Sequence, residues 1–274
     1  MKHIVVVART LALSILLTGV WASAATVVIN PGDGGWTNGD TRDATGVNVD
    51  PAPGRLDLNV SPPGGVSPSG NNVLRLVTDT GSAKATLQQS GVSLGNIANF
   101  SGSYTWYKEN AGAAAPAFKL GIDTTDSNPT SSRPGEALFD KFLVYEPYDN
   151  PDSGDPGTGV WVNQSFSLNS GGWWLVDRTA GNIQVNPPYS SLTLNQWLSD
   201  ATYGTRLSGG NIVAIQIGQG SGNAGLTSYV DSAAYTYGVN ALSESYVFGE
   251  PTPEPASLTV ISLAGALFIR RGRK

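Results

Sequence analysis

The side chains that could do chemistry in this chain are carboxylates and tryptophans, because other reactive types are missing from its body. The only histidine is His3, the only methionine is Met1, and cysteine is absent. Beyond residue 3 the sequence therefore excludes Ser-His-Asp and Cys-His mechanisms, zinc held by His or Cys, iron–sulfur clusters and disulfides. Hydrolysis of a glycan by two carboxyl groups about 5 to 10 Å apart remains as a catalytic option.

One pair of carboxylates has a spacing that would suit such hydrolysis. Glu136 and Asp140 are four residues apart and would share one face of a strand. The segment follows Arg133-Pro134-Gly135 and has no further catalytic pattern around it. It also lacks the E-x-D-x-x-E pattern of laminarinase-like jelly rolls. We therefore expect no enzymatic activity.

Tryptophan offers a second kind of chemistry, since the apolar C–H edges of sugar rings stack on exposed aromatic faces. The chain has 7 tryptophans, of which Trp173 and Trp174 are adjacent. If their segment is a strand, the two side chains must point to opposite faces. One of them would be in the core, and the other would face solvent and could bind a ligand. Trp106 and Trp197 are expected in the core.

The periodicity of the chain is that of β-strands. Alternation predicts strands at residues 27–30, 73–78, 103–108, 118–122, 141–146, 160–163, 173–177, 213–217 and 229–237. In the last of these, Tyr229, Asp231, Ala233, Tyr235 and Tyr237 are expected to share one face. Only residues 193–201 have helical spacing. Short strands separated by Gly, Pro, Asn, Asp and Ser clusters, without helical crossovers, favour an all-β antiparallel sandwich.

Residues 221–235 place a glycine-rich loop before a strand that contains an aromatic-Val-Asp sequence ending at Asp231. This pattern resembles carbohydrate-binding modules and related jelly-roll domains of the concanavalin-like class. The resemblance implies a jelly-roll-like sandwich. In such modules an aspartate of the last strand often binds a structural calcium together with an early loop, which implies a calcium site at Asp231, Asp33 and Asn30. The early loop lacks the glutamate often found there.

The C-terminus has the order of a sorting signal. Pro253-Glu254-Pro255 precedes an uncharged apolar run at 256–269, and four of the last five residues, 270–274, are basic. The run would form a helix of about 21 Å, which is short against a hydrocarbon core of about 30 Å. The basic end favours the cytoplasmic side.

This order resembles the PEP-CTERM signal of exported bacterial proteins, and the residues that carry the resemblance are Pro253, Glu254, Pro255, Arg270, Arg271 and the apolar run between them. The resemblance implies processing by an exosortase and a product at the cell surface or in an exopolysaccharide matrix. An ordinary C-terminal membrane anchor is the alternative.

The N-terminus has the features of a cleaved signal peptide. Lys2 precedes an apolar stretch at 10–20, and Ala22-Ser23-Ala24 offers a site for signal peptidase. Without both terminal signals, 10 of the 16 Lys and Arg residues and 20 of the 21 Asp and Glu residues remain, so the net charge is about −10. The remaining basic residues are scattered, which disfavours nucleic acid as a partner.

Together these features predict a signal peptide at 1–25, a jelly-roll-like β-sandwich at 26–242, a linker at 243–252 and a sorting signal at 253–274. The sandwich would thus be flanked by a signal helix and a short transmembrane helix. The expected function is that of an exported, non-catalytic surface or matrix protein associated with exopolysaccharide. A lectin-like carbohydrate-binding module is the alternative, and a glycoside hydrolase is a third possibility.

Overall fold

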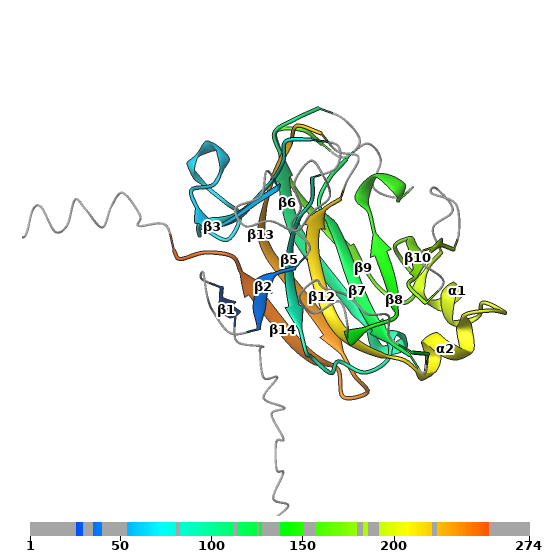
Figure 1. The fold of residues 1–274 in the computed structure, drawn as a ribbon. Coiled ribbons are helices and arrows are strands. Elements are labelled where there is room, and N and C mark those ends of the chain that lie inside the picture. Colours follow the sequence, from blue (N-terminus) through cyan, green and yellow to red (C-terminus); the bar gives the residue numbers. More distant parts are fainter. Residues whose placement is uncertain are drawn as a thin grey trace, which may run out of the picture.

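The computed structural model describes residues 26–29, 35–39, 54–80, 83–111, 114–124, 126–127, 138–150, 157–179, 183–185, 192–220 and 224–251 (Figure 1). The segments predicted as a signal peptide and a sorting signal, with their helices, lie outside these residues. Within them, no helix is long and apolar enough to cross a membrane.

The first sheet is built around the long strand β13. Its strands are β1 (Thr26–Val28), β3 (Gly54–Val60), β4 (Val73–Thr78), β6 (Ser101–Lys108), β9 (Trp161–Phe166), β13 (Leu226–Tyr237) and β14 (Leu242–Val247). One edge of β13 pairs with β6, which in turn pairs with β9. The other edge pairs first with β4 and then with β14. All these pairings are antiparallel except that of β1 with β14, which is parallel.

The second sheet is antiparallel and has the order β11-β10-β8-β7-β12-β5-β2. Its strands are β2 (Trp36–Asn38), β5 (Ala85–Ser90), β7 (Ala117–Asp123), β8 (Lys141–Tyr145), β10 (Trp173–Asp177), β11 (Ile183–Gln184) and β12 (Asn211–Gln219). The helices are α1 (Leu194–Leu198) and α2 (Gly204–Gly209), with short 3₁₀ turns at Pro63–Gly65, Ile97–Asn99 and Pro147–Asp149. Thr193 and Gln196 form a capping box that starts α1.

The core lies between the inner faces of the two sheets. Aromatic rings meet across it, with centroids 5.7 Å apart for Tyr104 and Phe118 and 5.0 Å apart for Phe166 and Trp173. Trp106 and Trp197 are buried, as the sequence predicted. The structure therefore confirms a β-sandwich, because both sheets bury apolar side chains against each other.

A β-bulge in β13 makes one prediction wrong. The pairing of β13 with β6 changes register between Val230 and Ser232, so Asp231 has no direct partner there. As a result Tyr229 pairs with Tyr107 on the outer face, while Tyr235 is buried on the inner face. The extra residue of a bulge reverses the alternation that follows it, so Tyr229 and Tyr235 do not share a face.

The segment 243–252, predicted as a linker, differs from that prediction because β14 occupies its first half. The alternating Ser and Glu residues of β14 hid the strand in the sequence. Glu244 points inward, where it accepts hydrogen bonds from the hydroxyls of Tyr235, Tyr237 and Tyr246. A carboxylate can take an inward position when hydroxyl donors satisfy it, and no periodicity of apolar residues reveals this.

Candidate functional site

The adjacent tryptophans lie on opposite faces of β10, as strand alternation requires. Trp173 is fully buried and packs against Tyr145, with ring centroids 5.4 Å apart. Its carbonyl oxygen accepts a hydrogen bond of 2.8 Å from Nε1 of Trp197. Trp174 is half-buried on the outer face of the second sheet. Trp174 is thus the member of the pair that could contact a ligand.

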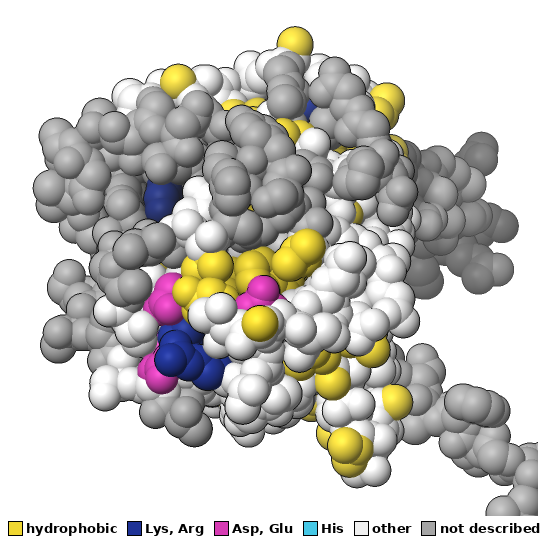
Figure 2. Space-filling model, turned by 90° about the vertical axis from the view of Figure 1, so that its right-hand side faces the viewer, with side chains coloured by type: hydrophobic (Ala, Val, Ile, Leu, Met, Phe, Trp, Pro, Cys, Tyr) yellow, Lys and Arg dark blue, Asp and Glu magenta, His cyan; other side chains and the backbone are white. Residues whose placement is uncertain are grey.

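Trp174 begins a row of side chains that crosses the outer face of the second sheet. The register joins it to neighbours on β8, β7, β12 and β5, and we call this set the second-sheet row: Trp174, Val144, Lys119, Gln216 and Gln88. With strands about 4.8 Å apart, the row is about 19 Å long. Figure 2 views the molecule from the side of β8 and β10, and shows hydrophobic side chains next to a group of charged ones. The row combines an aromatic ring with an ammonium group and two amides.

The amide end of this row is buried although it belongs to the outer face. Gln88 is 0% exposed and Gln216 is 2% exposed, and Nε2 of Gln216 donates a hydrogen bond of 2.5 Å to Oε1 of Gln88. Gly218 lies beside them, where an added Cβ would meet the carbonyl oxygen of Ala85 at 2.5 Å. Thr86 belongs to the same face, and its Oγ1 is buried with no hydrogen-bond partner in the structure. A buried hydroxyl without a partner is costly unless a ligand or water binds it.

No motif or spacing in the sequence marks Lys119, Gln88 or Gln216 as site residues. A signal existed in β5, where Thr86, Gln88 and Ser90 alternate with apolar or inward residues. The cross-strand neighbours of these residues follow only from the pairing register, which the sequence does not give.

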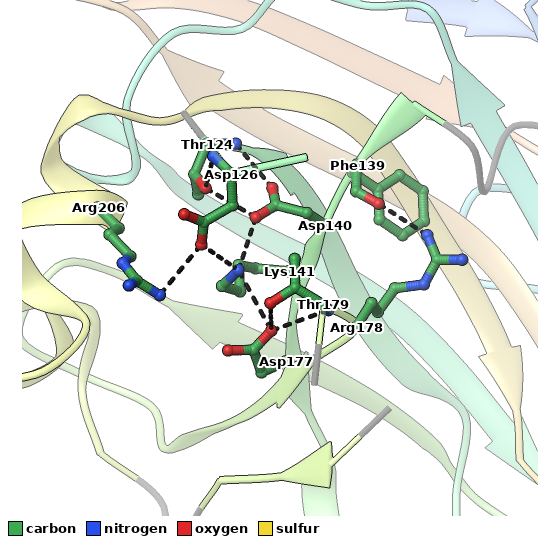
Figure 3. A network of polar contacts seen from close by, with 9 residues as sticks. All are labelled: Thr124, Asp126, Phe139, Asp140, Lys141, Asp177, Arg178, Thr179 and Arg206. Carbon is green, nitrogen blue, oxygen red and sulfur yellow. Dashed lines mark hydrogen bonds and ion pairs between the residues drawn. The ribbon is translucent and has the colours of Figure 1, made fainter. Parts of the chain in front are cut away.

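A buried lysine and three aspartates form a charged network at one end of the second sheet (Figure 3). Lys141 is fully buried, and its Nζ lies 2.6 Å from Asp140, 2.9 Å from Asp126 and 3.3 Å from Asp177. Arg206 of α2 is 3.1 Å from Asp126. Burial lowers the pKa of Lys141, but the three carboxylates outweigh it, so the pKa is raised and the ammonium stays charged. The network ties β8, β10 and α2 together.

Of the two carboxylates that could have supported hydrolysis, the structure describes only Asp140. Glu136 lies outside the described residues. Asp140 is fully buried, and its Oδ1 accepts a hydrogen bond of 2.8 Å from the backbone N–H of Thr124. Its Oδ2 accepts from Oγ1 of Thr124 at 2.7 Å and from Lys141. These contacts give Asp140 a role in fixing the loop after β7.

The predicted calcium ligand Asp231 lies at the bulge of β13. Its carboxylate is 1% exposed and accepts a hydrogen bond of 2.5 Å from Oγ of Ser69. Asn30 and Asp33, the other predicted ligands, lie outside the described part of the chain. Among the residues that are described, no group of three or more His, Cys, Asp or Glu side chains is arranged to hold a metal. A calcium site at Asp231 stays a prediction.

Comparison with known proteins gives low structural similarity and no sequence match. No family model and no curated protein matches the chain. A solved structure described as "CBM4 structure and function" has a TM-score of 0.31 and 12% identity, over 74% of this chain and 95% of its own. The module TmCBM61 in complex with β-1,4-galactotriose has a TM-score of 0.24 and 12% identity, over 67% and 88%. The lectin UEA-II with galactose has 0.31 and 16%, over 73% and 97%. These values are too low to transfer a ligand or a site to this chain.

Proposed function

We propose that this chain is an exported, non-catalytic protein that binds polysaccharide on the outer face of its second sheet. The observation that carries the proposal is the second-sheet row, in which a half-buried indole ring, an ammonium group and a buried amide pair occupy one line across five strands. Binding sites for small polar ligands combine apolar contact area with a few fixed polar groups. The row has this composition.

Each part of the row has a distinct role in this proposal. The ring of Trp174 stacks on the apolar face of a sugar ring. The Nζ of Lys119 hydrogen-bonds to sugar hydroxyls, and the buried hydrogen bond between Gln216 and Gln88 joins β12 and β5 at the far end of the row. No step of bond cleavage is included.

The location of the protein is part of the same proposal. Signal peptidase removes residues 1–25, the C-terminal helix holds the chain in the membrane during export, and an exosortase then processes the tail near Pro253. The order of tripeptide, apolar run and basic end supports this route. Intact-mass analysis of surface material from cells with and without the exosortase tests it. Mature protein that retains Arg270 and Arg271 would contradict processing.

Two substitutions at adjacent positions test the binding proposal. Trp174→Ala should weaken polysaccharide binding about fivefold to tenfold, since one stacked ring contributes about 1 kcal/mol or slightly more. Its melting temperature should change little. Trp173→Ala should lower the free energy of unfolding by about 3 to 5 kcal/mol, because it empties part of the core.

Val239→Ala is the control for Trp174→Ala, because Val239 is 85% exposed at the turn between β13 and β14. It should bind as wild type does. The proposal is wrong if Trp174→Ala binds equally well, or if both tryptophan variants lower the melting temperature by the same amount.

A further inference from the structure

The first sheet carries its own row of side chains on the opposite outer face. The register joins residues of β9, β6, β13, β4 and β3, and we call this set the first-sheet row: Trp161, Tyr107, Tyr229, Arg75 and Asp57. Its three aromatic residues lie side by side on the adjacent strands β9, β6 and β13. They face away from the core, because the side chains of Trp106 and Leu74, which precede Tyr107 and Arg75, are fully buried on the inner face.

The rings of this row are held in place by contacts with one another. Tyr107 lies between the other two, with its centroid 5.4 Å from Trp161 and 6.0 Å from Tyr229. The hydroxyl of Tyr229 donates a hydrogen bond of 2.6 Å to Oε1 of Glu109. Burial and this carboxylate raise the pKa of Tyr229 to about 12, so the ring stays uncharged at neutral pH. Trp161 and Tyr107 are half-buried, so part of each ring faces solvent.

The charges beside the aromatic rings are compensated within the row. The guanidinium of Arg75 lies 2.6 Å from the carboxylate of Asp57 and donates two hydrogen bonds to it. Because the protein is acidic overall and this cation is already paired, the row is a poor match for a polyanion. An uncharged ligand with apolar faces and hydroxyl groups matches it better.

A hollow lies on the same outer face, toward the N-terminal end of β6. It has a volume of about 560 Å³ and is lined by β6, β9, β13 and β14. Most of its lining side chains are small hydroxyls: Ser101, Ser103, Ser165, Thr236, Ser243 and Ser245. Ser103 and Tyr107 belong to one face of β6, four residues apart, so the hollow and the rings lie on the same face, about 13 Å from each other along the strand.

We propose that the first-sheet row is a second contact surface for an uncharged polysaccharide, so that one domain holds two chain segments on its opposite faces. The ligand class rests on the proposed function, but the surface and its residues are independent of the second-sheet row. Sugar rings stack on Trp161 and Tyr107, and their hydroxyls extend over the hollow. A domain with two such faces cross-links polysaccharide without forming a dimer.

Affinity electrophoresis tests the two faces separately. Wild type, Trp161→Ala, Trp174→Ala and the double variant are run in gels that contain hydroxyethyl cellulose, galactan or dextran. Val160→Ala is the matched control for Trp161→Ala, because Val160 is exposed and adjacent to it. Each single variant should lose part of the retardation, about fivefold in affinity, and the double variant should lose nearly all of it. In solution, wild type alone should raise the light scattering of the polymer.

The outcomes distinguish this proposal from the proposed function. If Trp161→Ala is retarded as much as wild type while Trp174→Ala is not retarded, the first-sheet row does not bind polysaccharide, and the site proposed on the second sheet stands. If Trp161→Ala loses binding and Trp174→Ala keeps it, the first-sheet row is the binding surface and the proposed site is wrong. If wild type is retarded by none of the polymers, both proposals are overturned.

Discussion

The two sheets of the sandwich hold their ion pairs in different surroundings. On the second sheet, Lys141 shares the inner face of β8 with Leu143 and Tyr145, is completely buried, and depends on carboxylates within the protein. On the outer face of the first sheet, the ion pair of Arg75 and Asp57 keeps side-chain exposures of 36% and 37%. Buried polar groups are costly when a partner is lost, whereas water solvates exposed ones. The network on the second sheet is therefore expected to be rigid and sensitive to substitution, and the ion pair on the first sheet to be tolerant.

The largest expected difference between the two sheets is the effect of removing the cation of each ion pair. Lys141→Ala leaves three carboxylates without their common cation and should lower the free energy of unfolding by about 3 to 5 kcal/mol. Arg75→Ala should cost at most about 1 kcal/mol, because its pair is exposed. Urea unfolding of both variants measures this. Equal losses of stability would show that burial does not make the network on the second sheet more sensitive than the ion pair on the first.

A bound cation would add a further difference at the bulge that separates the two halves of β13. If calcium binds at Asp231, a site filled at 100 times its Kd adds about 2.7 kcal/mol to the stability. EDTA should then lower the melting temperature of wild type and leave that of Asp231→Ala almost unchanged. A wild type that melts at the same temperature with EDTA and with calcium would end this prediction.

Acid should weaken the network on the second sheet. Burial raises the pKa of Asp177, but the hydrogen bond from Thr179 and the charge of Lys141 outweigh it, so the pKa lies below its ordinary value of 3.8. A carboxyl group with a lowered pKa stabilises the fold above its unfolded pKa, and this contribution is lost as the pH falls through the folded pKa.

We therefore expect the urea midpoint to fall as the pH decreases below about 4. Asp177→Asn should be less stable than wild type at pH 7, and its stability should change less with acid. Parallel acid profiles for the two proteins would contradict this.

The smallest expected effect is on the first-sheet row. Tyr229→Phe removes the hydrogen bond to Glu109 and should cost about 1 kcal/mol at neutral pH. The pKa of Tyr229 is raised to about 12, so its contribution is complete below about pH 10 and is lost as the pH rises through 12. Spectrophotometric titration should show one late-titrating phenol fewer in the variant. Glu109→Gln should move that phenol to lower pH, and an unchanged titration in both variants would rule out the contact.

Much of the fold could be predicted from the local alternation of apolar and polar residues in the sequence. It predicted most of the longer strands, the opposite orientations of Trp173 and Trp174, and the core positions of Trp106 and Trp197. Each of these predictions needs only the rule that successive side chains of a strand point to opposite faces, which can be applied to neighbouring residues. Which of the two tryptophans faces outward could not be predicted from the pair itself, because it depends on which side of β10 packs against the core.

What the sequence did not reveal depends on pairing between distant segments. The charged network joins Asp126, Lys141 and Asp177 only because β8 and β10 pair in one register. The outward position of Tyr229 depends on a bulge that shifts the alternation by one residue. Both rows are likewise products of register, and a shift of one residue would place their side chains in the core.

The parallel pairing of β1 with β14 determines how the domain would respond to tension. Thr26 lies beside Ser245 and Val28 beside Val247. The N-terminal end of β1 and the C-terminal end of β14 are therefore at opposite ends of the paired strands. Pulling on the N-terminal end of β1 and the C-terminal end of β14 loads their hydrogen bonds together in shear, and none is peeled off first. After β14, the backbone N–H of Asn72 donates a hydrogen bond to the carbonyl of Glu250 and adds a further fastening. Force applied between the two ends of the domain would therefore load β1 and β14 in shear.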